Sequence, residues 1–198
     1  MGKNILILLI ALLLCNCAGK NEKVSTPDYT SATTFKQDSL AFQLAMIYGL
    51  DQGIRTAPEF KNQVKLIQSI DTFNFNRIKL FIEQNGMLSE ELLGKENFKM
   101  EAVQSAFTAV LLHNPHRLVN EEENMQFFLK LVKDGKLKEK TFLSILDKYY
   151  WTKNKDRHVL YGSAFGMPCI NDKEKTNKAR KKLGFEPLAD SLFITCEK

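Results

Sequence analysis

Apolar residues recur at spacings of three and four through most of this 198-residue chain. That period places them on one face of an α-helix, whereas a half-buried strand requires strict alternation. The segment 35–56 is a clear case, because Leu40, Leu44 and Ile47 fall on a single helical stripe. Strand-like alternation is confined to the few residues near 158–161. The spacing therefore predicts an all-α fold.

Helix-ending signals divide this pattern into about seven antiparallel helices with short connections. The predicted helices are 35–56, 60–69, 71–85, 97–114, 121–134, 138–152 and 172–184, with a short helical turn at 89–93. Asp71 and Asn120 are predicted N-caps, since short polar side chains satisfy the free amides at helix starts. Gly86 and Pro115 are predicted to end the helices before them. One long loop, 153–171, precedes the last helix.

The first 34 residues have a different character. An uninterrupted apolar run of ten residues, Ile5–Leu14, follows Lys3. A membrane-spanning helix needs about 20 residues, so this run has the length of a signal-peptide core. We predict a signal peptide over residues 1–17, a flexible polar tether over 18–34 and a single helical domain over 35–198.

The end of the apolar run resembles a bacterial lipobox, in which Leu lies three places before the modified cysteine and a small residue directly before it. Cys17 has Leu14 at the first of these places and Asn16 at the second, whereas Cys15 fits less well. The resemblance implies a lipoprotein modified at Cys17 and anchored in the cell envelope, on the periplasmic or surface side of an outer membrane. A plain secretory signal is the alternative, and incorporation of radiolabelled palmitate distinguishes the two.

The net charge of +5 arises from 28 basic and 23 acidic residues spread along the chain. One basic cluster lies at 173–182, but it lacks the broad face and the aromatic or base-reading groups of a nucleic-acid-binding surface. We interpret this cluster as a solvated helix face. Nucleic acid is therefore not expected as a partner.

Sequence motifs that identify catalytic sites are mostly absent. The chain has no Gly-x-Ser-x-Gly elbow, phosphate-binding loop, His-Glu-x-x-His or Cys-x-x-Cys. His113 and His116 could share a metal on one helix, but Pro115 interrupts the helix between them. We predict no metal and no cofactor, and the motifs leave open whether the chain is an enzyme.

Two charged residues interrupt the core side of the first predicted helix. Asp51 and Arg55 lie four residues apart with the acid first, which is the favourable order on a helix. They continue the line of Ile47 and Ile54, which should face the core. A charged pair that points inward is costly unless each partner is satisfied. The pair therefore either holds neighbouring helices together or lines a cleft.

Three further polar residues border the predicted core. His113 lies at the end of an alanine-rich helix, and Asp147 lies beside the apolar stripe of a later helix. Tyr161 precedes a glycine in the long loop, an arrangement that often marks a turn over a cavity. Each of these residues, taken alone, is more often structural than catalytic.

The order of these residues resembles an uncharacterised family of bacterial all-helical domains. The family pattern is Asp-Gln-x-x-Arg, a Gly-Trp-Pro corner, Gln-His at a helix end, a lone Gln, an Asp-Arg pair and a Tyr-Gly-Thr-Gln-Phe loop. The matching positions are Asp51, Gln52, Arg55, Gly86, His113, Gln126, Asp147, Tyr161, Gly162, Phe165 and the segment 180–188. The resemblance spans roughly residues 45–188 and implies a helical fold with a shared polar cluster, but no particular reaction.

Several positions depart from that family pattern. The departing residues are Met87, Leu88, Leu112, Lys148, Val159, Ser163 and Ala164. Leu112 stands where the family has Gln, and Ala164 stands where it has Gln in the loop, so both remove a polar group. If the family has a catalytic site, the resemblance implies that this copy is altered.

Two cysteines, Cys169 and Cys196, remain beyond the signal region. An exported compartment permits disulfides, and a bond between these two residues would hold the C-terminal tail. Their spacing leaves the pairing open, because a disulfide requires close Cβ atoms.

Two functional hypotheses follow from these observations. The first is a ligand- or partner-binding module of the cell envelope. Its candidate binding residues are Asp51, Gln52, Arg55, His113, Gln126, Asp147 and Tyr161. Arg55 and His113 suit a small anionic ligand, while another envelope protein is the alternative partner. The second hypothesis is a hydrolase that uses Asp51 or Asp147 with His113 as an acid–base pair.

Overall fold

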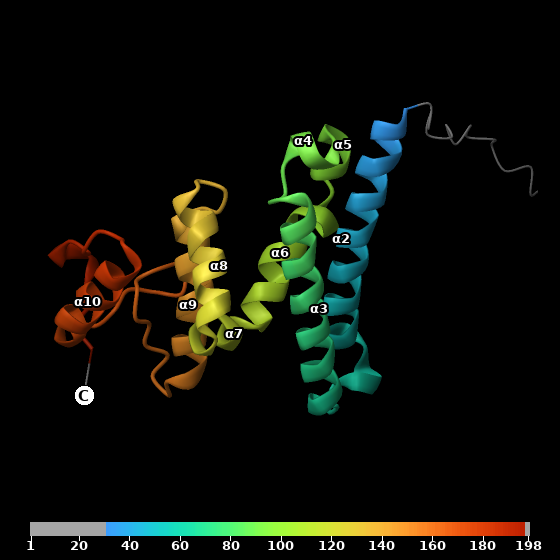
Figure 1. The fold of residues 1–198 in the computed structure, drawn as a ribbon. Coiled ribbons are helices and arrows are strands. Elements are labelled where there is room, and N and C mark those ends of the chain that lie inside the picture. Colours follow the sequence, from blue (N-terminus) through green and yellow to red (C-terminus); the bar gives the residue numbers. More distant parts are fainter. Residues whose placement is uncertain (1–30, 197–198) are drawn as a thin grey trace, which may run out of the picture. The chain divides into compact units, whose positions relative to one another are not determined.

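The computed structural model describes residues 31–196 of the chain (Figure 1). The chain divides between Ala32 and Thr33, and the fold described below is that of the unit beginning at Thr33. The predicted signal peptide, Cys17 and most of the tether lie outside the described residues. No helix in the described part of the chain combines the length and the apolar character needed to cross a membrane.

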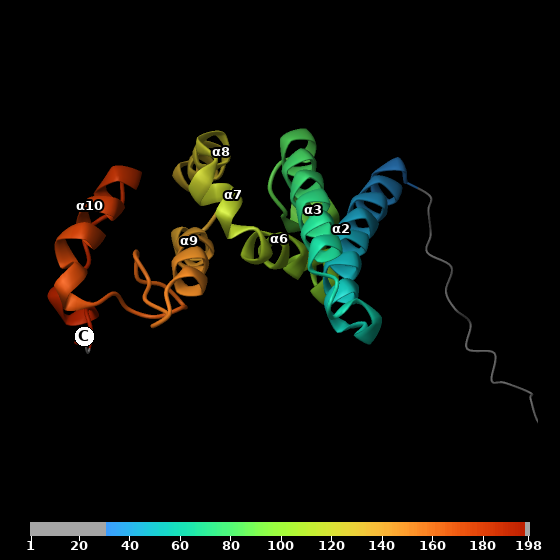
Figure 2. The ribbon, with the colours of Figure 1, turned by 90° about the horizontal axis from the view of Figure 1, so that it is seen from below.

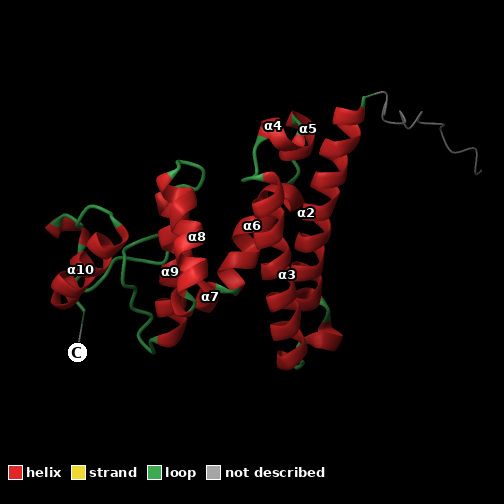
Figure 3. Cartoon of the chain, viewed as in Figure 1, coloured by secondary structure: helices red, strands yellow, loops and turns green. Residues whose placement is uncertain are grey.

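Helices account for all the regular structure within residues 31–196, as Figure 3 shows. The α-helices are α2 (Ala32–Thr56), α3 (Val64–Asn85), α4 (Glu90–Leu93), α5 (Lys95–Phe98), α6 (Glu101–His113), α7 (Pro115–Asn120), α8 (Glu122–Lys133), α9 (Glu139–Lys153) and α10 (Lys173–Leu183). The 3-10 segments are η1 (Pro58–Phe60), η2 (Ile170–Asp172) and η3 (Asp190–Leu192). The predicted all-α fold is confirmed, although these described residues form nine α-helices rather than about seven.

Several predicted boundaries in the first part of the fold are wrong; for example, the helix expected over 97–114 is divided into α5 and α6. Residues 60–69 and 71–85 were expected as separate helices, but α3 runs through Asp71 without a break. No Gly or Pro lies within Val64–Asn85, so the local capping preference of Asp71 does not end the helix. Helix α2 begins at Ala32, within the predicted tether, because no Gly or Pro separates this residue from the apolar stripe.

Pro115 has two roles where one was predicted. It ends α6, as expected, but it also begins α7, where its missing N–H is not needed. Asn120 is consequently the last residue of α7 and not the N-cap of α8. The capping of α4 by Ser89 agrees with the predicted start at that residue, since its hydroxyl accepts the Leu92 N–H at 3.1 Å.

Helices α2 and α3 run side by side in both views of the ribbon (Figures 1 and 2). Helix α6 packs against α3 and α9, and α7 packs against α8 and α9. Phe128 of α8 is fully buried, and its ring lies 6.1 Å from the rings of both Phe75 and Phe107. These aromatic contacts join α3, α6 and α8 in one core, because large rings bury much apolar area.

The C-terminal region is held by a disulfide and a buried arginine. Cys169 and Cys196 form the bond that the sequence left open, with their Cα atoms 5.6 Å apart. Cross-linking residues 27 positions apart stabilises a fold by about 3 kcal/mol in the chain-entropy treatment. Arg180 of α10 donates to the main-chain oxygens of Tyr161 at 2.9 Å and Glu186 at 2.6 Å. The long loop before α10 is therefore fixed at several points.

Candidate functional site

A buried carboxylate near the C-terminal end of α2 is the centre of the candidate site. Asp51 is fully buried, and its two carboxylate oxygens each lie 3.0 Å from Nδ1 of His113. Gln52 donates to Oδ2 of Asp51 at 2.7 Å, and the Arg55 guanidinium lies 3.3 Å from Oδ1. The buried charge is thus satisfied by three side chains.

Arg55 links this carboxylate to a second helix. One guanidinium nitrogen donates to the main-chain oxygen of Asp51 at 2.7 Å, and the other pairs with the carboxylate of Asp71 on α3. We name these five residues, Asp51, Gln52, Arg55, Asp71 and His113, the Asp51 cluster. The cluster connects α2, α3 and α6, as the first of the two predicted roles of the inward-facing pair requires.

The Asp51 cluster also borders a cleft of about 550 Å³. The cleft is lined by Arg55, Gln68, Asp71, Leu112, His113, Pro115, His116, Asn120, Lys148, Tyr149, Thr152 and Lys153. The side chains of Arg55 and His113 are 23% and 30% exposed, respectively. A solute entering the cleft can therefore reach Arg55 and His113, whereas Asp51 is not part of the lining.

A further part of the cleft lining comes from α9. Lys148, Tyr149, Thr152 and Lys153 follow one another at helical spacing in this part of the lining. The ammonium group of Lys148 lies 4.4 Å from the ring centre of Trp151 and 5.1 Å from that of Phe165. Such cation–π contacts restrict the side chain while keeping its charge.

Positive charge predominates among the side chains that line the cleft. The basic residues of the lining are Arg55, Lys148 and Lys153, and its one carboxylate is that of Asp71. Arg55 is itself paired with the carboxylates of Asp51 and Asp71, so the excess positive charge comes from the two lysines. Exposed charges on one concave surface raise the local concentration of ions of opposite sign, so the cleft is suited to an anion.

Two of the sequence candidates lie elsewhere and have structural partners. Oδ1 of Asp147 accepts the main-chain N–H groups of Leu160 at 2.9 Å and Tyr161 at 2.8 Å. The Tyr161 side chain is buried and packs edge-on against Tyr150 at 6.0 Å between ring centres. Asp147 and Tyr161 thus fasten the long loop to α9, and neither contributes to the cleft lining.

Gln126 is also remote from the candidate site. It is exposed on α8 and donates to the Glu122 carboxylate at 2.7 Å, one helical turn away. Of the seven sequence candidates, Asp51, Gln52, Arg55 and His113 converge in the Asp51 cluster. Gln126 matches the same family pattern as these four residues, but it does not lie in the Asp51 cluster.

Several cleft residues were not found from the sequence. The sequence predicts Asp71 as a helix cap, and it gives no reason to assign the face of α9 that carries Lys148, Thr152 and Lys153 to a site. Polar and basic residues four positions apart do define one face of a helix. This spacing does not indicate which neighbouring helix that face contacts.

Burial perturbs the acid that fastens the long loop. Removal from water raises the pKa of the Asp147 carboxyl above its usual 3.8, and the hydrogen bonds from the Tyr161 and Leu160 N–H groups oppose this shift. Burial likewise raises the pKa of the Tyr161 hydroxyl, with added repulsion from Tyr150 and Asp147. Both shifts arise because a low-dielectric environment disfavours the charged form.

The raised pKa of Asp147 gives a testable dependence of stability on pH. Above pH 3.8 the unfolded chain releases the Asp147 proton while the folded chain still holds it, so stability falls as pH rises toward the raised pKa. The variant Asp147→Asn does not titrate at this position. Urea denaturation across this pH range should show a steeper decline for the wild type than for Asp147→Asn, and parallel curves would contradict the assignment.

Asp51, Asp71 and His113 place oxygen and nitrogen atoms within 4.8 Å of one another, a spacing compatible with a metal ion. The Arg55 guanidinium, however, pairs with both carboxylates. A divalent cation at this position would have to displace the Arg55 guanidinium. The arrangement therefore favours Arg55, rather than a metal ion, as the partner of the two carboxylates.

Comparison with known proteins gives no relative from which a function could be transferred. No protein family, no curated protein and no solved structure matches the chain. The function is therefore argued from the geometry and the charge of the cleft.

Proposed function

We propose that this chain is a ligand-binding helical module of the cell envelope, and that the cleft beside the Asp51 cluster takes a small anion bearing phosphate or carboxylate groups. The observation that carries the proposal is that Arg55 of α2 and Lys148 and Lys153 of α9 all line one cleft. An anion in this cleft would meet basic side chains from two parts of the chain.

The Asp51 cluster supports this proposal by orienting Arg55. Asp51 and Asp71 engage one edge of the guanidinium, which limits the conformations that a ligand would otherwise have to restrict. Planar guanidinium groups bind phosphate and carboxylate with paired hydrogen bonds. A pre-oriented arginine therefore loses less conformational entropy when a ligand binds.

Pyrophosphate is a suitable first probe because it is small and multiply charged and carries no organic group that a specific site would have to recognise. Isothermal titration should detect binding to the wild type, weakened by added salt. The double variant Lys148→Ala, Lys153→Ala should bind about tenfold or more weakly, since a hydrogen bond to a charged group contributes about 1.5–3 kcal/mol.

The matched control for this titration is Lys140→Ala. Lys140 lies on the same helix, α9, and is exposed, but it does not line the cleft. The control should bind pyrophosphate as the wild type does. Equal binding by the double variant and the wild type would refute the assignment of the cleft, and so would the absence of binding by pyrophosphate and by a panel of phosphorylated and carboxylated metabolites.

The contact between Asp51 and His113 favours one alternative, a hydrolase. Asp51 engages Nδ1 of His113, so Nε2 is the ring nitrogen left to accept a proton from water. A carboxylate that orients an imidazole in this way is a common acid–base arrangement. If a substrate screen finds hydrolysis, His113→Ala should abolish it while His158→Ala retains it, and retention by His113→Ala would exclude this mechanism.

The predicted lipid anchor bears on where in the cell the cleft acts. The family resemblance bears on which proteins share the Asp51 cluster. Modification of Cys17 would hold the domain at a membrane surface of the envelope. The resemblance includes Asp51, Gln52, Arg55 and His113, and these four residues meet in one cluster. Their convergence supports the proposal that the polar cluster is a feature common to that family.

A further inference from the structure

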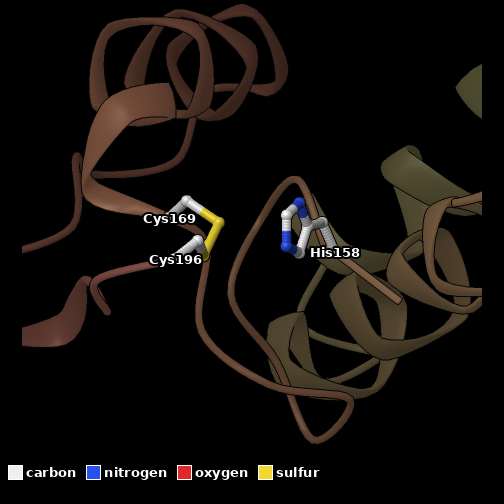
Figure 4. Close-up of side chains that lie close together, drawn as sticks. All are labelled: His158, Cys169 and Cys196. Atoms are coloured by element: carbon white, nitrogen blue, oxygen red, sulfur yellow. A yellow bond between two sulfur atoms is a disulfide. The ribbon is translucent and has the colours of Figure 1, made fainter. Parts of the chain in front are cut away.

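A second group of side chains with metal-binding chemistry lies far along the chain from the cleft. The imidazole of His158 lies beside the Cys169–Cys196 disulfide, as Figure 4 shows. One ring nitrogen of His158 and the two sulfur atoms all lie within 4.8 Å of one another. Cys169 is buried, whereas His158 and Cys196 are partly exposed.

Main-chain hydrogen bonds hold these segments in place independently of the sulfur–sulfur bond. The N–H of Ile170 donates to the oxygen of Ile194 at 2.8 Å, and the N–H of Ile194 donates to the oxygen of Pro168 at 3.0 Å. The main-chain oxygen of His158 accepts from the Asn154 side chain at 3.0 Å. Breaking the disulfide therefore leaves the three side chains near one another.

We propose that reduction of the Cys169–Cys196 disulfide converts this group into a zinc site with His158 as the third ligand. Zn²⁺ prefers cysteine sulfur and histidine nitrogen in tetrahedral sites. Zinc–sulfur bonds of about 2.3 Å and a zinc–nitrogen bond of about 2.0 Å hold the ligand atoms roughly 3.5–3.8 Å apart. The three ligand atoms already lie within 4.8 Å of one another, and reduction frees the two bonded sulfur atoms to move apart to the separation that zinc requires.

The chemistry balances with a phosphine as the reductant. The phosphine supplies two electrons and becomes a phosphine oxide with oxygen taken from water, and the disulfide becomes two thiols. Zinc then binds both sulfurs as thiolates and releases their two protons, while His158 binds through a neutral ring nitrogen. The oxidised chain offers no thiolate, so binding is conditional on reduction.

The fourth position of such a zinc ion would face an adjoining cleft. This cleft of about 360 Å³ is lined by His158 and Cys196 together with the apolar side chains of Phe165 and Met167. Three protein ligands and an open position are the pattern of zinc sites that exchange a water or bind a further ligand. The proposed site is therefore one for exchangeable zinc rather than a closed structural one.

Cobalt(II) is the spectroscopic probe for this site, because tetrahedral cobalt–thiolate centres absorb in the visible and near ultraviolet. The experiment uses the full chain carrying Cys15→Ser and Cys17→Ser, which leaves Cys169 and Cys196 as its cysteines. After reduction with a phosphine, titration should give thiolate charge-transfer and tetrahedral bands that saturate at one cobalt per chain and disappear when Zn²⁺ is added. The oxidised chain should give neither band.

The decisive variant is His158→Ala, which keeps the disulfide and allows folding to be checked by circular dichroism before reduction. It should weaken cobalt binding by more than about tenfold, since even outer-shell partners of metal sites are worth that much. His116→Ala, in the other cleft, should bind cobalt as the parent does. The proposal is wrong if reduced protein gives no thiolate band, or if His158→Ala binds as tightly as the parent.

Discussion

Asp51→Ala is expected to lower the free energy of unfolding by about 3–5 kcal/mol, the usual cost of removing one partner from a buried ion pair. Asp51 is fully buried and receives hydrogen bonds or ion pairs from His113, Gln52 and Arg55. Truncation removes the acceptor of Gln52 and His113 and leaves Arg55 with Asp71 as its carboxylate partner. It also releases the contact between α2 and α6.

Urea denaturation followed by circular dichroism measures this loss. Gln104→Ala, at an exposed position on α6, is the control and should change stability by less than about 0.5 kcal/mol. A double-mutant cycle with His113→Ala should reveal a coupling of about 0.5–3 kcal/mol between the two residues. A loss below about 1 kcal/mol for Asp51→Ala would show that the cluster does not hold the helices together.

Asp147→Ala is the second large expected effect, with a loss of about 2–6 kcal/mol. The carboxylate accepts two main-chain N–H groups, those of Leu160 and Tyr161, in a buried setting. Each donor left without an acceptor costs about 1–3 kcal/mol. Asp147→Asn should lose less, because its amide oxygen can accept the same two N–H groups.

The comparison between these two variants identifies the cause of the loss. If the accepting oxygen atom at position 147 accounts for the loss of stability, Asp147→Asn should retain most of the stability that Asp147→Ala loses. Similar losses in both would indicate instead that the charge of Asp147 is required. Lys140→Ala, exposed on the same helix, reports the background effect of a substitution on α9.

The sequence predicts the helices where a long apolar stripe decides the structure, as in α2, α8 and α9. It fails at Asp71 because capping is a local preference, whereas α3 is decided by the burial of Phe75, Ile78 and Phe81. It also misses α7, because Pro115 is compatible with both ending one helix and starting the next.

The candidate site was partly predictable for a similar reason. Asp51 and Arg55 stand out because they place charge on an otherwise apolar stripe, and the structure brings them to the cleft. Lys148 and Lys153 give no such signal, since basic residues on a helix are usually solvated. Their place in the same cleft lining as Arg55 depends on how α6 and α7 pack against α9, which no local pattern encodes.

The lining of the cleft comes from segments far apart in the chain. Arg55 and Asp71 belong to α2 and α3, whereas Lys148 and Lys153 belong to α9. A ligand that touches both parts of the lining would act as a non-covalent cross-link between the early and late helices. Local opening of either part would then require its release. When such a ligand is bound, amide hydrogens at the end of α2 and amide hydrogens in α9 should therefore both exchange with solvent more slowly than in the free protein. No backbone hydrogen bond joins these two segments.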